Sequence, residues 1–177
     1  MKSAVLVIDV QAGLFLKQDL PAEAKEVVSR INEITRKARA ASVPVIFVQH
    51  EAPDSALSYG TDGWQLQEDL ESEANDLKIC KTTPDSFMNT GLEAKLRSLR
   101  VDNLIVCGYA SEFCVDTTVR RGAGLGFSIT LVADAHTTHD KKHFSGIAIR
   151  DHENETLSHI TSFGVSISAV PSTEISF

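Results

Sequence analysis

The sequence contains little cysteine: its 177 residues include three, at positions 80, 107 and 114. Their number is odd and their spacing matches no common zinc motif, so neither a disulfide framework nor a structural zinc site is predicted. Cys80 and Cys107 lie within apolar, strand-like segments, where cysteine is usually a small buried hydrophobic residue. We therefore expect a reducing, cytoplasmic setting with Cys114 as the only functional thiol.

Long apolar runs and an excess of positive charge are also absent. No segment approaches the length needed to cross a bilayer, and Met1-Lys2-Ser3 leads directly into a strand-like segment, so membrane insertion and secretion are not expected. The formal net charge of -7 argues against nucleic acid as the main partner, because phosphate binding requires clustered lysine and arginine. Without internal repeats or linkers, and with 42% hydrophobic residues, the chain is expected to form one domain, residues 1–177.

Strand-like and helix-like segments alternate from end to end. Strands are expected at 3–8, 43–49, 77–80, 103–107, 127–132 and 165–170, and helices at 22–41, behind a capping box at 90–93, at 112–123 and at 151–163. This alternation predicts an α/β fold: a three-layer, Rossmann-like α/β/α sandwich with a six-stranded, mostly parallel sheet. If the strand order is 3-2-1-4-5-6, ligands bind where the order reverses, beyond the ends of the first and fourth strands.

Three reactive side chains stand where predicted strands end. Asp9 follows the first strand, Lys81 follows the third, and Cys114 begins the helix after the fourth. These ends meet at one edge of a parallel sheet, and the positive end of the helix dipole favours an ionised thiol. Cys114 is then a candidate nucleophile, Asp9 its proton acceptor and Lys81 the cation that holds Asp9 ionised. The backbone N–H groups of Ala110 and Cys114 are candidates for binding an oxyanion.

A purely structural explanation of these residues stays open, because aspartate at a strand end is often a turn residue and lysine there is usually solvated. Glu112 is a candidate substrate contact and equally a complement to the helix N-terminus. Further candidates for the pocket wall, each equally well explained by core packing, are the aromatic residues Phe15, Trp64, Phe87, Tyr109 and Phe113.

The motifs around these residues resemble those of the isochorismatase-like cysteine hydrolases. The family includes nicotinamidases, N-carbamoylsarcosine amidases, ureidoacrylate amidases and streptothricin hydrolases. The resemblance covers nearly the whole chain and rests on Val7-Ile8-Asp9-Val10-Gln11, on Lys81 followed by Asp85-Ser86-Phe87-Met88-Asn89-Thr90, on Gly108 to Val115, and on Asp134-Ala135.

The resemblance implies a catalytic triad of Asp9, Lys81 and Cys114. It also implies a non-proline cis peptide between Tyr109 and Ala110, which turns the Ala110 N–H towards the substrate. Gln11, in the same motif as Asp9, is a further candidate substrate contact. Isochorismate hydrolases of the family cleave an enol ether without a cysteine nucleophile, so Cys114 favours a C–N bond in an amide, lactam or ureido compound.

The resemblance also bears on cofactors. Metal-binding nicotinamidases carry Asp-x-His after the second strand and another histidine before the triad lysine. Here the first region reads Gln49-His50-Glu51, and no histidine lies between His50 and Lys81, so neither a nicotinamidase nor a metal is favoured. His136, His139 and His143 have spacings compatible with metal ligation but fall in a loop predicted after the fifth strand.

The expected activity is therefore a cofactor-free hydrolysis of a small molecule. The branch of streptothricin hydrolases is suggested by Thr137-Thr138-His139-Asp140 and by His152. Three alternatives stay open: a vinyl-ether hydrolase of the isochorismatase type, a nicotinamidase, and a non-catalytic relative that binds a small ligand. Members of the family are typically oligomeric, so a homodimer or homotetramer is expected.

Overall fold

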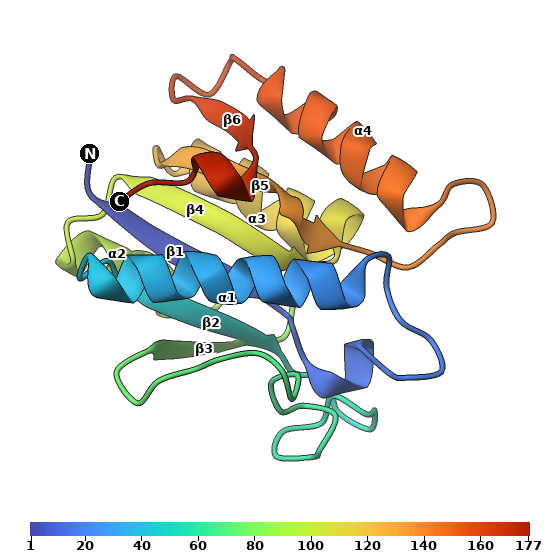
Figure 1. Ribbon diagram of the computed structural model, residues 1–177. Helices are drawn as coiled ribbons and strands as arrows, with labels where there is room; N and C mark the ends of the chain where they lie inside the picture. The colour runs from blue at the N-terminus through green and yellow to red at the C-terminus, as the bar shows by residue number, and fades with distance from the viewer.

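A computed structural model describes all 177 residues and contains one parallel sheet between helices (Figure 1). The order across the sheet is β3-β2-β1-β4-β5-β6, and every neighbouring pair is parallel. The fold class and the strand order predicted from the sequence are confirmed. The strands are β1 (Ser3–Ile8), β2 (Val45–His50), β3 (Leu77–Lys81), β4 (Asn103–Tyr109), β5 (Ser128–Thr137) and β6 (Ile167–Val170).

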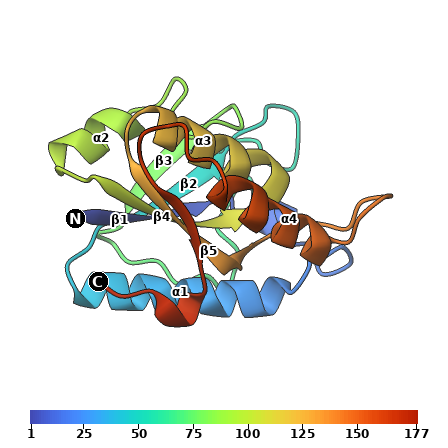
Figure 2. The same ribbon diagram turned by 90° about the horizontal axis from the view of Figure 1, so that it is seen from above.

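Helices cover both faces of the sheet, as the view from above shows (Figure 2). Helix α1 lies on one face, α2 and α3 lie on the other, and α4 packs on β5 and β6 beside α3. The α-helices are α1 (Ala24–Ala40), α2 (Leu92–Ser98), α3 (Asp116–Gly124) and α4 (Gly146–Ser158). The short helical turns are η1 (Ala12–Leu14), η2 (Ser111–Val115) and η3 (Ser172–Glu174).

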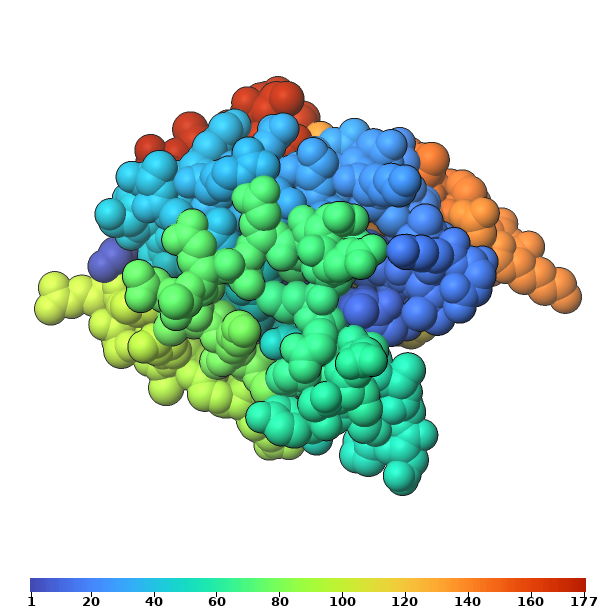
Figure 3. Space-filling model, turned by 60° about the horizontal axis from the view of Figure 1, so that its bottom comes forward, coloured from blue at the N-terminus to red at the C-terminus, as the bar shows by residue number.

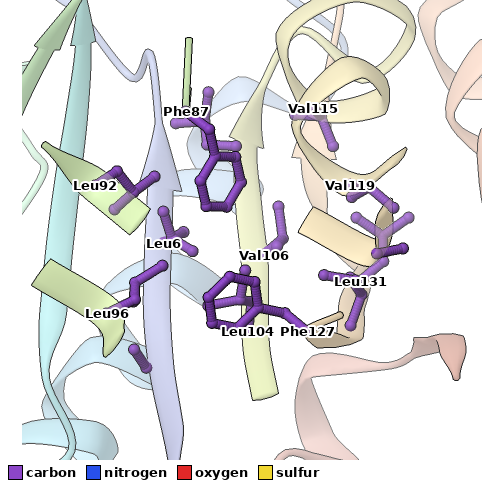
Figure 4. Close-up of a cluster of buried hydrophobic side chains, with 14 of the residues drawn as sticks. Leu6, Phe87, Leu92, Leu96, Leu104, Val106, Val115, Val119, Phe127 and Leu131 are labelled. Atoms are coloured by element: carbon purple, nitrogen blue, oxygen red, sulfur yellow. The ribbon is translucent and has the colours of Figure 1, made fainter. Parts of the chain in front are cut away.

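The sheet divides the core into two halves. Side chains alternate along each strand, so Leu6 of β1 packs on the side of α2 and α3, whereas Val7 packs on the side of α1. Figure 4 shows the first half, in which Leu92 of α2, Val106 of β4 and Val119 of α3 belong to one cluster of buried side chains. Because both faces of β1 and β4 are covered, these strands read as continuous apolar runs in the sequence.

Helix α1 follows from its apolar spacing. Val27, Ile31, Ile34 and Ala38 recur every three or four residues and are completely buried against the sheet. The helix predicted at 22–41 is confirmed to within two residues at each end, since one continuous apolar face defines it.

The predicted end of the fifth strand and the position of the last helix were wrong. Strand β5 continues to Thr137 through an irregularity, because pairing passes from Val106 with Leu131 to Gly108 with His136. The residues expected in a histidine-rich loop therefore begin inside the sheet. Helix α4 begins five residues earlier than predicted, where the Ser145 hydroxyl accepts a hydrogen bond from the Ala148 N–H at 3.2 Å.

The predicted start of the helix behind residues 90–93 was also wrong. The predicted capping box does not form, because the Thr90 hydroxyl accepts from the Leu92 N–H at 3.3 Å and not from the N–H of Glu93, and α2 begins only at Leu92. In the helix after Cys114, Gly122 lies within α3. A Cβ there would come within 3.1 Å of Ile129, so this glycine allows the helix to pack closely on the sheet.

The edge strand β3 and the segment that precedes it lie at one side of the molecule. Cys80 of β3 is exposed, contrary to the expectation from its apolar neighbours, because an edge strand of this sheet is covered less completely than a central one. Residues 51–76, coloured from teal to green in Figure 3, spread over the surface, and their teal tip projects from it. None of the helices combines the length and apolar character that crossing a bilayer requires.

Candidate active site

The candidate site lies at the carboxyl ends of β1, β2, β3 and β4. Asp9 follows β1 directly with a positive φ of 50°, a conformation that aspartate tolerates better than most residues. Lys81 is the last residue of β3, and Cys114 lies in the π-helical turn η2 after β4. Strands β1 and β4 are neighbours in the sheet and flank the reversal of strand order, where α/β folds bind ligands.

Lys81 brings these side chains together. Its Nζ lies 2.7 Å from Asp9 Oδ2 and 3.2 Å from Cys114 Sγ. The lysine is 2% exposed, so its charge is held inside the protein beside that of Asp9. A buried charge requires a partner in this way. The three residues predicted to form a triad therefore meet, as the ends of parallel strands dictate.

His50 is a fourth member of this cluster. The sequence pattern indicated it only as part of an incomplete metal-binding motif. Its Nδ1 lies 3.2 Å from Lys81 Nζ, and its ring lines the same cavity as Asp9 and Cys114. An ammonium group has three protons, so Lys81 can donate one each to Asp9, Cys114 and His50. Burial, followed by the charge of Lys81, lowers the pKa of His50, which keeps Nδ1 available as an acceptor.

The predicted order of the strands could have placed His50 beside Lys81. This histidine is the last residue of β2 and pairs in register with Lys81 on β3. The residue is also fixed through its backbone, because Gln11 donates to the His50 carbonyl at 3.0 Å and accepts from the His50 N–H at 2.8 Å. Gln11 thus holds the end of β2 in place and is completely buried outside the cavity lining.

A small cavity of about 180 Å³ opens above the cluster. Its polar lining consists of Asp9, His50 and Cys114, and the rest of the wall is mainly apolar. The other lining residues are Leu14, Leu57, Pro84, Tyr109, Ala110 and Phe113.

The turn between β4 and η2 contains the non-proline cis peptide bond between Tyr109 and Ala110. No protein group accepts a hydrogen bond from the Ala110 N–H, although Ala110 is 2% exposed and lines the cavity. Close strand packing precedes the turn: a Cβ at Gly108, whose φ is +122°, would lie 2.1 Å from the Ile8 carbonyl oxygen. Glycine is therefore required where β4 passes β1 just before the site.

The electrostatics of the thiol differ from the expectation. Burial, followed by the negative charge of Asp9, raises the pKa of Cys114 to about 12, and the opposing effect of Lys81 is smaller. The net direction is opposite to the lowered thiol pKa expected from the helix start, since desolvation of the charged form is the largest effect. Burial likewise raises the pKa of Asp9, which makes this carboxylate a better proton acceptor.

The donor atoms of Asp9, His50 and Cys114 lie within 4.8 Å of one another, a spacing that a metal ion can bridge. Lys81 Nζ is within 3.2 Å of all three side chains, so its ammonium group already supplies the positive charge that a metal would bring. This donor set does not fit a metal while the lysine is protonated.

The three histidines with metal-like spacing do not converge. His136 is completely buried, with Nε2 2.9 Å from Asn154 Oδ1 and Nδ1 2.8 Å from the Ser111 hydroxyl. His139 instead contacts the Tyr109 hydroxyl through Nδ1 at 2.8 Å. His143 packs against the ring of Phe144.

The remaining predicted substrate contacts divide into two groups. Tyr109 and Phe113 line the cavity. Phe15 packs edge-on against Tyr109 at a centroid distance of 5.9 Å and lies behind the wall. Phe87 is a core residue of the half that faces α2 and α3, as Figure 4 shows.

Trp64 and Glu112 lie near the site without lining the cavity above Cys114. The Trp64 ring packs on Tyr59 at 4.8 Å, and its carbonyl accepts hydrogen bonds from Gln11 and Gln49. The Glu112 carboxylate accepts from the Thr138 hydroxyl at 2.9 Å and lines a neighbouring cavity.

Comparisons with known proteins identify related sequences and structures. The family model described as the isochorismatase domain matches residues 3–162. Two streptothricin hydrolases of Streptomyces noursei are 36% and 33% identical over 77% and 82% of this chain. The alignments cover 50% and 58% of those proteins, so the chain spans little more than half the length of these curated relatives.

A more distant relative and a solved structure extend the comparison. A ureidoacrylate amidohydrolase of Pseudomonas syringae pv. syringae is 27% identical over 76% of this chain and 70% of its own length. A crystal structure of an isochorismatase family protein superposes with a TM-score of 0.87 at 30% identity, covering 95% of this chain and 97% of the other.

Proposed function

The chain belongs to the isochorismatase family, and on that premise we propose that it is a cysteine hydrolase that cleaves a C–N bond in a small amide, lactam or ureido compound. The observation that carries the proposal is the position of Lys81 Nζ, 2.7 Å from Asp9 and 3.2 Å from Cys114. The names of two relatives, a streptothricin hydrolase and a ureidoacrylate amidohydrolase, support hydrolysis, and the second supports an amide-type bond.

The first step forms the bond between sulfur and the substrate carbon. With a pKa of about 12, the Cys114 thiol is protonated at neutral pH, so it ionises only as its proton passes to Asp9. Sulfur attacks the carbonyl carbon and the carbonyl electron pair moves to oxygen. The free N–H of Ala110 and the N–H of Cys114 donate to this oxyanion. Lys81 compensates the negative charge that moves between Asp9 and the sulfur.

The next steps release the two products. Asp9 gives its proton to the leaving nitrogen, the C–N bond breaks, and an amine departs from a thioester on Cys114. Asp9 then takes a proton from water as the water oxygen attacks the thioester carbon. When the C–S bond breaks, Asp9 returns that proton to the sulfur. The sum is amide plus water giving acid plus amine, with the site restored.

His50 is assigned a positioning role. It accepts the third proton of Lys81 and so keeps the ammonium group between Asp9 and Cys114. Without this acceptor, one N–H of the buried Lys81 would lack a partner, which is costly for a charged donor.

A screen of primary amides, ureido acids and lactams for ammonia or amine release tests the proposal, with wild type, Cys114→Ala and Asp9→Asn compared on each hit. We expect both variants to lose nearly all turnover while remaining folded by circular dichroism, because residues that act as a unit give large, non-additive losses. Mass spectrometry of the quenched wild-type reaction is expected to find the acyl group on the Cys114 peptide. A fully active Cys114→Ala enzyme would exclude the thioester and favour enol-ether hydrolysis.

A further inference from the structure

A second cavity, of about 460 Å³, lies beside the one above Cys114. Phe113 lines both cavities and so separates them. The other lining residues come from η2, the segment before α4, and α4 itself: Glu112, Lys141, His143, Phe144, Ile149, His152 and Glu153.

The two cavities share Phe113, which makes the second one the adjoining space for a ligand that reacts at Cys114. The cavity above Cys114, at about 180 Å³, is smaller than the roughly 300–1,000 Å³ usual for small-molecule sites. It holds the reacting group and little else. The second cavity lies within that range, and a molecule that occupied both would run past the Phe113 ring.

Two carboxylates in the second cavity lack full partners. Glu112 Oε1 accepts from Thr138 and lies 3.0 Å from Lys141 Nζ, but Glu112 Oε2 is buried without a hydrogen bond. Glu153 Oε2 is likewise buried without one. Burial, followed by the nearby charge of Asp116, raises the pKa of Glu153, and the positive charge of Arg120 offsets this only in part. Both oxygens lack a donor within the protein and have almost no exposed surface, so an ammonium group in the cavity would bind them once the side chains turn towards it.

The aromatic walls favour the same kind of ligand. Phe113 and Phe144 are 55% and 58% exposed, an unusual exposure for such large apolar rings. Lys141 already holds its Nζ 5.6 Å from the Phe113 ring centre and beside Glu112. The chain's own ammonium group thus shows that this combination of ring face and carboxylate accepts a cation.

We propose that the second cavity binds a primary ammonium group of the substrate, held by Glu112 and Glu153 beside the face of Phe113, while the bond to be cleaved lies over Cys114. That the ammonium group belongs to a substrate rests on the proposed function. The binding of an ammonium group does not, because it depends only on the second cavity.

Binding of n-hexylammonium to the intact protein, measured by calorimetry and compared with 1-hexanol, tests the inference. The two probes share their apolar chain, so the difference reports the charge. We expect hexylammonium to bind roughly tenfold more tightly, the usual size of a charge-assisted hydrogen bond. Glu153→Gln and Glu112→Gln should each remove most of that preference. Glu155→Gln, on the same helix but with a side chain 79% exposed, is the matched control and should keep it.

Equal affinity for the two probes would overturn the inference, and so would a preference that survives both Glu112→Gln and Glu153→Gln. Cys114→Ala separates the two proposals. It should abolish turnover and leave hexylammonium binding unchanged, whereas an active Cys114→Ala enzyme with intact binding would contradict the mechanism alone.

Discussion

Asp9 and Lys81 act on the Cys114 thiol in opposite directions. The negative charge of Asp9 raises the pKa of the thiol, and the positive charge of Lys81 lowers it. Asp9 therefore both opposes a free thiolate and receives the proton when the thiolate forms. This division of roles keeps the thiol protonated until a carbonyl is in place.

Asp9→Asn is expected to lower the pKa of Cys114 while abolishing turnover, because it removes the charge that opposes the thiolate and leaves Lys81 in place. The rate of alkylation by iodoacetamide, followed as a function of pH by peptide mapping of Cys114, measures the shift. The curve of the variant should lie at lower pH than that of wild type. Asp54→Asn is a matched control, since Asp54 also has a positive φ, of 58°, but lies on an exposed loop.

An unchanged or higher midpoint in Asp9→Asn would show that Asp9 does not control the thiol. Cys80 serves as an internal standard in the same experiment because it is exposed, whereas Cys107 is fully buried and should react slowly throughout.

His50→Leu is expected to lower kcat by roughly tenfold or more, because one buried proton of Lys81 loses its acceptor. His50→Asn should recover part of this loss, since its amide oxygen lies near the position of the imidazole Nδ1 that contacts Lys81. Steady-state kinetics on an amide found in the screen would show the effect in kcat. Equal kcat in the leucine and asparagine variants would mean that His50 only fills space.

At the scale of elements, His136 ties three parts of the chain together. It lies on β5 and contacts Ser111 at the start of η2 and Asn154 on α4. Asn154 donates its amide to the Ala133 carbonyl, so its oxygen faces His136 and must accept from Nε2–H. Nδ1 then accepts from the Ser111 hydroxyl, and the imidazole is neutral. The turn that carries Cys114 is held to the sheet and to α4 by this one side chain.

Burial lowers the pKa of His136 from 6.5 to about 4, which predicts a loss of stability in acid. Between these two values the unfolded chain binds a proton that the folded chain does not, so the free energy of unfolding should fall by about 3 kcal/mol as the pH drops through this window. Urea unfolding from pH 7 to pH 4 would measure it.

His136→Gln is expected to be less stable at pH 7 and to lose most of this pH dependence. His159→Gln, where the side chain is 77% exposed, should behave as wild type. A wild-type stability that stays constant between pH 6.5 and 4 would contradict the assignment of a neutral buried imidazole.

Elements with a continuous or regularly repeating apolar pattern could be predicted from the sequence. The apolar runs of β1 and β4 and the periodic face of α1 determine the sheet and one of its layers, and they bring Asp9 and Cys114 to the same edge. Features that depend on tertiary contacts were missed. The extension of β5 depends on its irregular pairing with β4, and the packing role of Gly122 depends on the side chain of Ile129.

The same limit applies to the site. Asp9 and Lys81 are recognisable because they stand at strand ends, whereas the direction of the Cys114 pKa depends on how deeply the turn is buried. Tyr109 and Phe113 resemble Phe87 in the sequence, and only packing separates the rings that line the cavity from the one in the core.

At the scale of the whole molecule, we predict that the protein is a homodimer or homotetramer. Tyr59 is 69% exposed and packs on Trp64 within the projecting segment 51–76, and exposed aromatic residues of this kind are often anchors of an interface. Light scattering on the purified protein gives the mass directly. A strictly monomeric protein that keeps full activity when diluted would contradict this prediction.

The place of Lys81 on an edge strand has a further consequence. Strand β3 pairs only with β2, so it is held by fewer neighbours than the central strands and belongs to the part of the sheet that can open without global unfolding. Each such opening would carry the lysine away from Asp9 and Cys114. In mild denaturant, turnover should therefore disappear before the far-ultraviolet circular dichroism changes, and hydrogen exchange should be faster in residues 77–81 than in β1 or β4. Activity then reports the fraying of a single strand.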